Sequence, residues 1–170
     1  MGTPNFVLKL REKIGHDPLW LVGITAYVQD RNGRILLGRR SDTGEWALVY
    51  GINEPGEEAA DTVIREVREE TGVDVIPKTL ACVKSSKLML TYANGDQTQY
   101  MDHLFICELR DGGNSVPFVG DEESLQVGWF DAEALPEPLA KTTVERLAYI
   151  REFEENSRNG DNRALFAHEL

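Results

Sequence analysis

Cysteine is scarce in this chain, which contains two, Cys82 and Cys107. Both stand in strand-like segments, and their spacing does not form a CxxC pair. A disulfide framework and a metal site of the CxxC type are therefore excluded. We expect two reduced thiols, buried in the core of a cytoplasmic protein.

Basic residues are also in short supply. Lys and Arg number 18 against 29 Asp and Glu, which gives a net charge of −11. Unspecific binding to nucleic acid needs a basic surface, and an anionic membrane repels an acidic one. We therefore expect neither nucleic acid nor a membrane as a partner.

Long apolar runs are absent as well. The longest, residues 19–28, is too short to cross a bilayer, which takes about 20 apolar residues. Residues 1–13 alternate charged and apolar side chains, so they do not read as a signal peptide. We expect a soluble protein, and the length of 170 residues fits a single domain over residues 1–170.

What the chain does have is one highly informative stretch, residues 51–73, which reads GINEPGEEAADTVIREVREETGV. At about 7% average usage for each residue type, a match at seven fixed positions arises by chance at on the order of 10⁻⁸ per starting position. The fixed positions are Gly51, Glu57, Arg65, Glu66, Glu69, Glu70 and Gly72.

The same stretch predicts a loop followed by a helix of about four turns. Pro55 and Gly56 make a sharp entry. Acidic side chains, which suit the positive end of the helix dipole, follow in the first turn: Glu57, Glu58 and Asp61. Apolar residues recur at helical spacing and predict one buried stripe: Ala60, Val63, Ile64 and Val67. Gly72 stands where a left-handed cap ends a helix.

Three carboxylates near the end of this helix are unfavourably placed for stability. Glu66, Glu69 and Glu70 are spaced i, i+3, i+4, so they share a face on which like charges repel by roughly 0.2–0.5 kcal/mol per pair. Arg65 is placed to offset part of that repulsion. One interpretation is a solvated acidic face. The other is a site for a hard divalent cation such as Mg²⁺, which prefers oxygen ligands.

The spacing of residues 51–73 resembles the Nudix box in full, which favours the second interpretation. The resemblance implies an α/β fold, an α/β/α sandwich with a mixed β-sheet, and a Mg²⁺ cofactor for which Mn²⁺ can substitute. It implies metal ligands at Glu66, Glu69 and Glu70 and at the backbone of Gly51. It also implies a catalytic group made up of Glu66, Glu69, Glu123 and Arg65. One carboxylate must act as general base, a role worth about 10²–10⁴ in rate, and the motif does not say which.

The rest of the chain predicts strands and helices in one domain. Helices are expected over residues 4–15, with Phe6, Val7, Leu10 and Ile14 facing inward, and from about residue 139 past residue 153. Strands are expected at residues 20–29, 34–40, 46–50, 75–90, 97–108 and 125–130. The segment 139–170 combines the last helix with a polar tail, whose apolar pair Leu165-Phe166 is either an interface or the end of a disordered segment. This order predicts a mixed sheet between helical layers.

Weaker candidates for substrate binding lie outside the carboxylate group or beside it: Arg39, Arg40, Glu57 and His103. Arg39 or Arg40 could bind a phosphate through its guanidinium fork, or both could be solvated at a strand end. Glu57 is expected to tie the loop to the helix. His103 is more readily explained as a partly buried histidine of a strand face.

Five aromatic residues complete the candidates. Tyr92 and Tyr100 flank the Asn94-Gly95 turn, and we prefer a cross-strand pair to stacking on a base. Trp129 and Phe130 are expected in the core, behind the acidic pair Glu122 and Glu123, of which Glu123 is the preferred metal or base residue. Val49-Tyr50 departs from the family, whose members commonly have Pro-Gly or a second Gly there, so Tyr50 adds bulk where the backbone approaches metal and phosphate.

The resemblance implies hydrolysis of a pyrophosphate bond in a nucleoside diphosphate linked to another group, of the ADP-ribose or nucleotide-sugar type. The partner is then a small nucleotide, and a homodimer is expected. Within the same class, a nucleoside triphosphate pyrophosphohydrolase is the alternative. A non-catalytic nucleotide-binding regulator and an isoprenoid diphosphate isomerase that uses Cys82 or Cys107 are less favoured, because the motif is intact and buried thiols are the simpler account.

Overall fold

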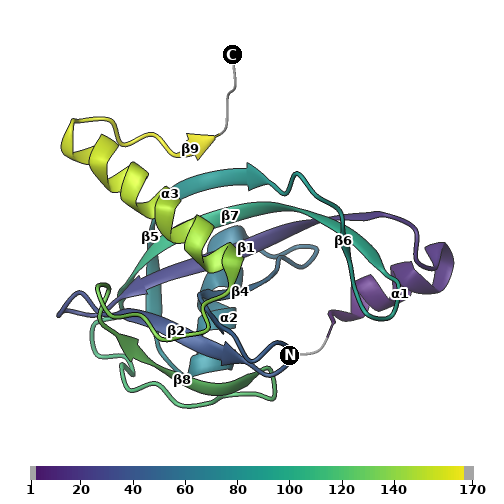
Figure 1. The fold of residues 1–170 in the computed structure, drawn as a ribbon, viewed down its shortest axis with the longest axis horizontal. Coiled ribbons are helices and arrows are strands. Elements are labelled where there is room, and N and C mark those ends of the chain that lie inside the picture. The colour runs from purple at the N-terminus through teal and green to yellow at the C-terminus, as the bar shows by residue number, and fades with distance from the viewer. Residues whose placement is uncertain (1–2, 167–170) are drawn as a thin grey trace.

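The computed structural model describes residues 3–166, which form helical layers around one mixed sheet (Figure 1). Its helices are α1 (Asn5–Ile14), α2 (Ala59–Thr71) and α3 (Lys141–Arg158). Its strands are β1 (Leu19–Gln29), β2 (Ile35–Arg40), β3 (Trp46–Ala47), β4 (Val49–Ile52), β5 (Val75–Ser85), β6 (Leu90–Thr91), β7 (Gln97–Leu109), β8 (Ser124–Phe130) and β9 (Leu165–Phe166). This is the predicted α/β class with a mixed sheet.

The described strands form one nine-stranded sheet in which β1 is central. The main path runs β3-β2-β1-β7-β5-β9, while β4 pairs with β1, β6 with β7 and β8 with β2. β1 and β7 run parallel, and the neighbouring β1–β4 and β5–β7 pairs are antiparallel. The composition of β1 suits a central position, because its apolar and β-branched residues are buried on both faces of the sheet.

The core has two halves, one on each face of the sheet. On one face, Val63 and Val67 of α2 pack with Ile24, Ala26 and Val28 of β1. On the other face, residues of α3 pack against Tyr27 and Leu104: Leu147, Ile150 and Phe153. Figure 1 shows α3 in front of the sheet and α2 behind it, which is the expected sandwich.

The first helix differs from the expectation in how it packs. α1 buries Val7, but Leu10, predicted to face inward, is 38% exposed. α1 lies at the end of the sheet beside β6 (Figure 1), and hydrogen bonds from Arg11 tie it to β7. Arg11 donates from Nη2 to the carbonyl of Gln97 at 2.7 Å and to Oγ1 of Thr98 at 3.0 Å.

Two other expectations about elements need correction. The strand predicted over residues 75–90 ends at Ser85, because the chain leaves the sheet there and Leu88 is exposed, and β6 is a separate short strand. The Leu165-Phe166 pair forms β9, which runs parallel to β5, and Leu165 joins the core beside α3. The rest of the predicted tail, residues 167–170, lies outside the described residues.

Within residues 3–166, none of the helices combines the length and the apolar character needed to cross a membrane.

Candidate functional site

Gly51 brings the backbone of β4 against the side chain of Glu66. It pairs with Ile24 of β1 at the edge where β4 meets α2. A Cβ added at Gly51 would lie 2.1 Å from both Cδ and Oε1 of Glu66, so the carboxylate occupies the space that a side chain would fill. The glycine is therefore required by a close approach of a carboxylate to the backbone.

The buried face of α2 is partly polar, contrary to the predicted apolar stripe. Ala60 is exposed, and Glu66 and Glu70 lie on the buried face with Val63 and Val67. Glu66 is 8% and Glu70 4% exposed, so both carboxylates are largely removed from water. Glu69, the third member of the predicted group, is partly exposed at the edge of this face. The interpretation as a solvated acidic face is therefore wrong for Glu66 and Glu70.

Arg65 connects three of the predicted glutamates. Its Nε and Nη2 donate to the two carboxylate oxygens of Glu57 at 2.8 and 3.0 Å. Its Nη1 donates to Oε1 of Glu66 at 2.8 Å and to Oε2 of Glu69 at 3.3 Å. The hydrogen bonds from Arg65 hold the pKa of Glu57 down at about 2. Glu57 thus joins the loop before α2 to the middle of that helix.

Burial raises the pKa of Glu66 to about 7, although Arg65 opposes the shift. Burial and the charge of Glu66 raise the pKa of Glu70 to about 8. Both carboxylates are removed from water, and the positive charge near them does not fully compensate for the lost hydration. A divalent cation would supply the missing positive charge. Oxygen donors of this kind fit a hard cation. Among residues 3–166, however, no three Asp, Glu, His or Cys side chains already converge as a coordination sphere.

Glu123 approaches the same region from the loop before β8. Arg40 donates from Nη1 to Oε2 of Glu123 at 3.0 Å, and the charge of Glu123 acts on both Glu66 and Glu70. Glu122, the neighbouring alternative, is exposed. The structure therefore brings five predicted residues into one region: Glu66, Glu69, Glu70, Glu123 and Arg65.

The weaker candidates are spread around this region. Arg39 donates from Nε to the carbonyl of Gly44 at 3.0 Å and so holds the turn after β2. His103 of β7 lies in register with Ile24 and, across β1, with Gly51. Two strand spacings separate His103 from Gly51, which is about 10 Å. Nδ1 of His103 is buried and has no hydrogen-bond partner among the described residues.

The aromatic pairs behave as expected. The hydroxyls of Tyr92 and Tyr100 lie 2.8 Å apart, which makes them a cross-strand pair. Trp129 packs against the core on the α2 side and Phe130 against the core on the α3 side.

Sequence reasoning missed the surroundings of Tyr50. The Cζ atoms of Arg40 and Arg146 each lie 5.1 Å from the centre of its ring. Arg146 belongs to α3, and its Nε donates to Oδ2 of Asp102 at 2.8 Å. The motif did not include Arg146 or Asp102. The signal for Tyr50 was its departure from the family pattern.

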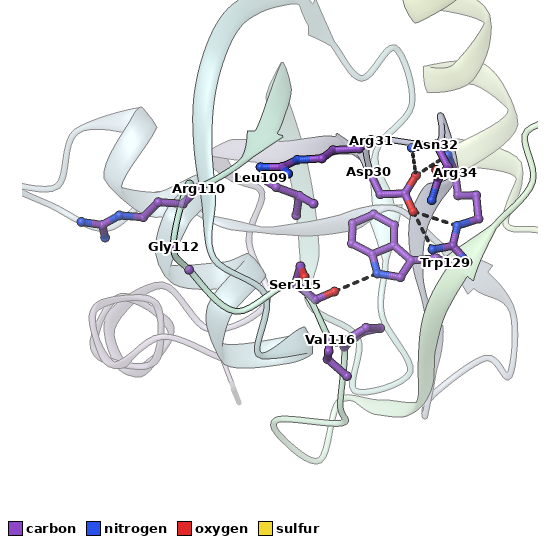
Figure 2. A pocket seen from close by; sticks show the side chains of 12 residues that line it. Asp30, Arg31, Asn32, Arg34, Leu109, Arg110, Gly112, Ser115, Val116 and Trp129 are labelled. Atoms are coloured by element: carbon purple, nitrogen blue, oxygen red, sulfur yellow. Dashed lines mark hydrogen bonds and ion pairs between the residues drawn. The ribbon is translucent and has the colours of Figure 1, made fainter.

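A cavity of about 500 Å³ lies at the opposite end of β1 and β2, between the turn at residues 30–34 and the loop at residues 109–117. Figure 2 shows that two of its polar groups, the carboxylate of Asp30 and the indole N–H of Trp129, have partners within the protein. Asp30 accepts from Nε of Arg34 at 2.7 Å, and Nε1 of Trp129 donates to the carbonyl of Ser115 at 3.0 Å. Arg110 points away from the cavity in this view. Because these two groups are already hydrogen-bonded within the protein, they favour a structural role for this cavity.

Comparison with known proteins identifies the family. A model of the NUDIX domain matches residues 20–153. The match includes the β6–β7 hairpin and most of α3.

Three similar proteins illustrate the relationship. The 8-oxo-dGDP phosphatase NUDT18 of Mus musculus is 27% identical over 151 residues, which is 88% of this chain and 42% of that protein. A MutT NUDIX hydrolase from Burkholderia pseudomallei is 28% identical with a TM-score of 0.61 over 78% of this chain and 98% of that one. An ADP-ribose pyrophosphatase from Streptococcus suis is 25% identical with a TM-score of 0.63 over 86% and 98%.

The chain spans less than half the length of the curated mouse relative. Members of this family generally use divalent metal ions. With the matched model covering most of the chain and the intact motif lying inside the match, the chain belongs to the NUDIX domain family.

Proposed function

We propose that this protein is a pyrophosphohydrolase that depends on a divalent metal ion. Its substrate is a nucleoside diphosphate linked to another group, of the ADP-ribose or nucleotide-sugar type. The observation that carries the proposal is the pair of buried carboxylates, Glu66 and Glu70, of which Glu66 lies against the bare backbone of Gly51. Without a cation this arrangement is costly, because two desolvated carboxylates repel one another.

The metal is Mg²⁺, for which Mn²⁺ can substitute. Glu66, Glu69, Glu70 and the backbone of Gly51 would hold it, and when bound it would neutralise phosphate charge and lower the pKa of the attacking water. Arg65 orients Glu66 and Glu69 through the two hydrogen bonds described above. Glu57 fixes Arg65 from the other side.

Two carboxylates are candidates for the general base that takes the proton from water. The side chain of Glu69 is 33% and that of Glu123 28% exposed, so both can reach a water molecule at the edge of the buried pair. Glu66 and Glu70 would hold the metal throughout, whereas Glu69 would either complete the metal site or act as the base. The two candidates approach from different segments, α2 and the loop before β8.

The substrate class is supported by relatives whose printed activities concern 8-oxo-dGDP and ADP-ribose. A nucleoside triphosphate pyrophosphohydrolase is the alternative within the same chemistry. The homodimer and the cytoplasmic location expected from the sequence stay predictions.

The test is a panel of nucleotides with Mg²⁺ in ¹⁸O-labelled water, with the products identified by mass spectrometry. We expect ADP-ribose or a nucleotide sugar to be cleaved and one phosphate monoester product to carry the label. Glu66→Gln and Glu70→Gln should each lower turnover at least about a hundredfold with the fold retained.

Glu58→Gln is the matched control, because Glu58 is an exposed glutamate at the start of the same helix and its side chain makes no capping hydrogen bond. This control should keep wild-type turnover. Unchanged activity in both site variants would contradict the proposal, and nucleotide binding without turnover would favour the regulator.

A further inference from the structure

Tyr50 lies at the centre of a charged cluster that the proposed chemistry does not yet use. Its ring centre is 5.1 Å from Cζ of Arg40 and 5.1 Å from Cζ of Arg146. Both distances lie within the range of cation–π attraction. We call Tyr50, Arg40, Arg146 and Asp102 the Tyr50 cluster. It joins the end of β2, the strand β4 that leads into the motif, the strand β7 and the helix α3.

One end of the Tyr50 cluster is fixed to the central strands. Nε of Arg146 donates to Oδ2 of Asp102 at 2.8 Å, and Oγ1 of Thr25 donates to Oδ1 of the same carboxylate at 2.8 Å. The side chains of Arg146 and Asp102 are 16% and 19% exposed, so water competes little for these bonds. The position of Arg146 is therefore set by β1 and β7 as well as by its own helix.

At the other end of the Tyr50 cluster, hydrogen bonds hold the edges of the Arg40 guanidinium group. Its Nε and Nη2 donate to the two oxygens of Asp42 at 3.2 and 3.1 Å, and its Nη1 donates to Oε2 of Glu123 at 3.0 Å. These hydrogen bonds lie in the plane of the guanidinium group and leave its face without a polar contact. The ring of Tyr50 supplies a contact to the guanidinium group of Arg40. Tyr50 therefore limits the motion of this group that its hydrogen bonds alone would permit.

Glu123 depends on this arrangement because of its surroundings. Its charge acts on Glu66 and Glu70, and the repulsion between like charges favours movement of Glu123 away from the pair. The hydrogen bond to Nη1 of Arg40 opposes that repulsion. A displaced Arg40 would therefore carry Glu123 away from the region where the proposed metal and water meet.

We propose that Tyr50 and Arg146 are positioning residues that act through Arg40 to set where Glu123 stands relative to Glu66 and Glu70. The inference rests on the proposed function and deepens it. Neither residue touches the reacting atoms in this scheme. Their loss should therefore lower kcat and leave KM nearly unchanged. The bulky residue before the motif is then a functional replacement for the small residue that the family pattern favours.

The first experiment measures kcat and KM for ADP-ribose hydrolysis with Mg²⁺. Tyr50→Leu and Arg146→Gln should each lower kcat about tenfold, with KM within about twofold of wild type. Tyr50→Phe keeps the ring and should restore kcat to within about twofold. Adding Tyr50→Leu to Arg40→Gln should cause no further loss, because both changes act on one contact.

Two matched controls separate positioning from loss of stability. Tyr27→Leu removes a buried tyrosine from the core beneath α3, and Arg151→Gln removes an exposed arginine from α3. Tyr27→Leu should lower the melting temperature at wild-type kcat, and Arg151→Gln should change neither quantity. Unchanged kcat in folded Tyr50→Leu and Arg146→Gln, a rise confined to KM, or additive losses in the double variant would overturn the inference.

A second readout does not depend on turnover. The NMR signal of the Arg40 Nε–H group, assigned with Arg40→Gln, should exchange slowly with solvent in the wild type and in Tyr50→Phe. It should exchange at least about tenfold faster in Tyr50→Leu and Arg146→Gln. Equal exchange rates in all these proteins would overturn the inference. Failure of the wild type to cleave any nucleotide would instead count against the proposed function.

Discussion

At the scale of single residues, the missing side chain of Gly51 is as important as the carboxylates. A methyl group there would meet Cδ and Oε1 of Glu66 at 2.1 Å. Glu66 cannot retreat freely, because it is buried and held by Arg65. We expect Gly51→Ala to lower turnover about a hundredfold, since small misplacements of catalytic groups cost that much.

A Mg²⁺ titration of turnover, together with a thermal melt, checks this prediction. Gly23→Ala on the neighbouring strand is the control, because its added Cβ would meet its nearest neighbours at an ordinary 3.5 Å. Gly23→Ala should stay within about twofold of wild type. Wild-type turnover in Gly51→Ala would show that the backbone approach is dispensable.

The raised pKa values of Glu66 and Glu70, about 7 and about 8, predict a pH dependence of metal binding. In the metal-free protein these groups hold protons that a cation must displace, so affinity for Mg²⁺ should rise from pH 6 and level off above about pH 8. Calorimetry in buffers of different ionisation enthalpy measures the released protons. Glu70→Gln should release fewer protons than the wild type, and no proton release near pH 6.5 would refute the expectation.

The same shifts fix the sign of a stability effect. Both groups bind protons more tightly in the folded metal-free chain than in the unfolded one. Their stabilising contribution is therefore complete below the unfolded pKa and is lost as the pH rises through about 7 and about 8. Added Mg²⁺ should reverse the loss, because it binds the folded chain.

The residues of the candidate site were predictable from the sequence where the motif specifies them, and not elsewhere. The spacing indicated Glu66, Glu69, Glu70 and Arg65 because helix geometry converts sequence spacing into a shared face. It did not indicate that Glu66 and Glu70 are buried, because burial depends on what covers the helix. Arg146 was out of reach of any local pattern, since its partner Asp102 lies 44 positions away in the chain.

At the scale of elements, the loop between β7 and β8 completes the end of α2. The amides of Phe118 and Gly120 donate to the carbonyls of Thr71 and Glu70 at 2.9 and 3.1 Å, and Nδ2 of Asn114 donates to the carbonyl of Gly72 at 2.7 Å. These carbonyls have no partner within the helix. The loop therefore fixes the end of α2 and carries Glu123 beyond it.

Gly120 allows this close contact. An added Cβ would lie 1.9 Å from the carbonyl oxygen of Glu69, so Gly120→Ala must lift the loop from the helix. We expect faster amide hydrogen exchange at Phe118 and Gly120 and a fall in turnover of at least about tenfold. Gly112→Ala in the same loop is the control. An alanine at its φ of 73° is strained by its own backbone, but no atom of the described residues lies within 4 Å of the added Cβ. Equal effects of the two changes would contradict this account.

Elements were predictable to the extent that their patterns are local. The strand at residues 20–29 and the helix within residues 51–73 have strong periodicity and formed as expected. The break after Ser85 was missed, because residues 86–90 keep an apolar composition although Leu88 has nothing to pack against. β9 was missed because its two residues become a strand only beside β5.

At the scale of the whole molecule, the two thiols report on the integrity of the sheet. Burial raises the pKa of Cys82 to about 11 and that of Cys107 to about 12. The reactive thiolate is therefore rare at pH 8 as well as inaccessible. We expect no reaction with a thiol reagent in the native protein and two equivalents in guanidinium chloride. Ser85→Cys, at an exposed position of β5, should react at once. Rapid labelling of the native wild type would refute this prediction.

The parallel pairing of β1 with β7 has a consequence for synthesis on the ribosome. The two strands are in register from Leu19 with Thr98 to Gln29 with Glu108, yet the whole of α2 and β5 is translated between them. At about 5–20 residues per second, β1 waits on the order of ten seconds for its partner. During that interval a strongly apolar segment emerges with one edge open, so the nascent chain should be a substrate for chaperones that shield strands until translation has passed residue 109.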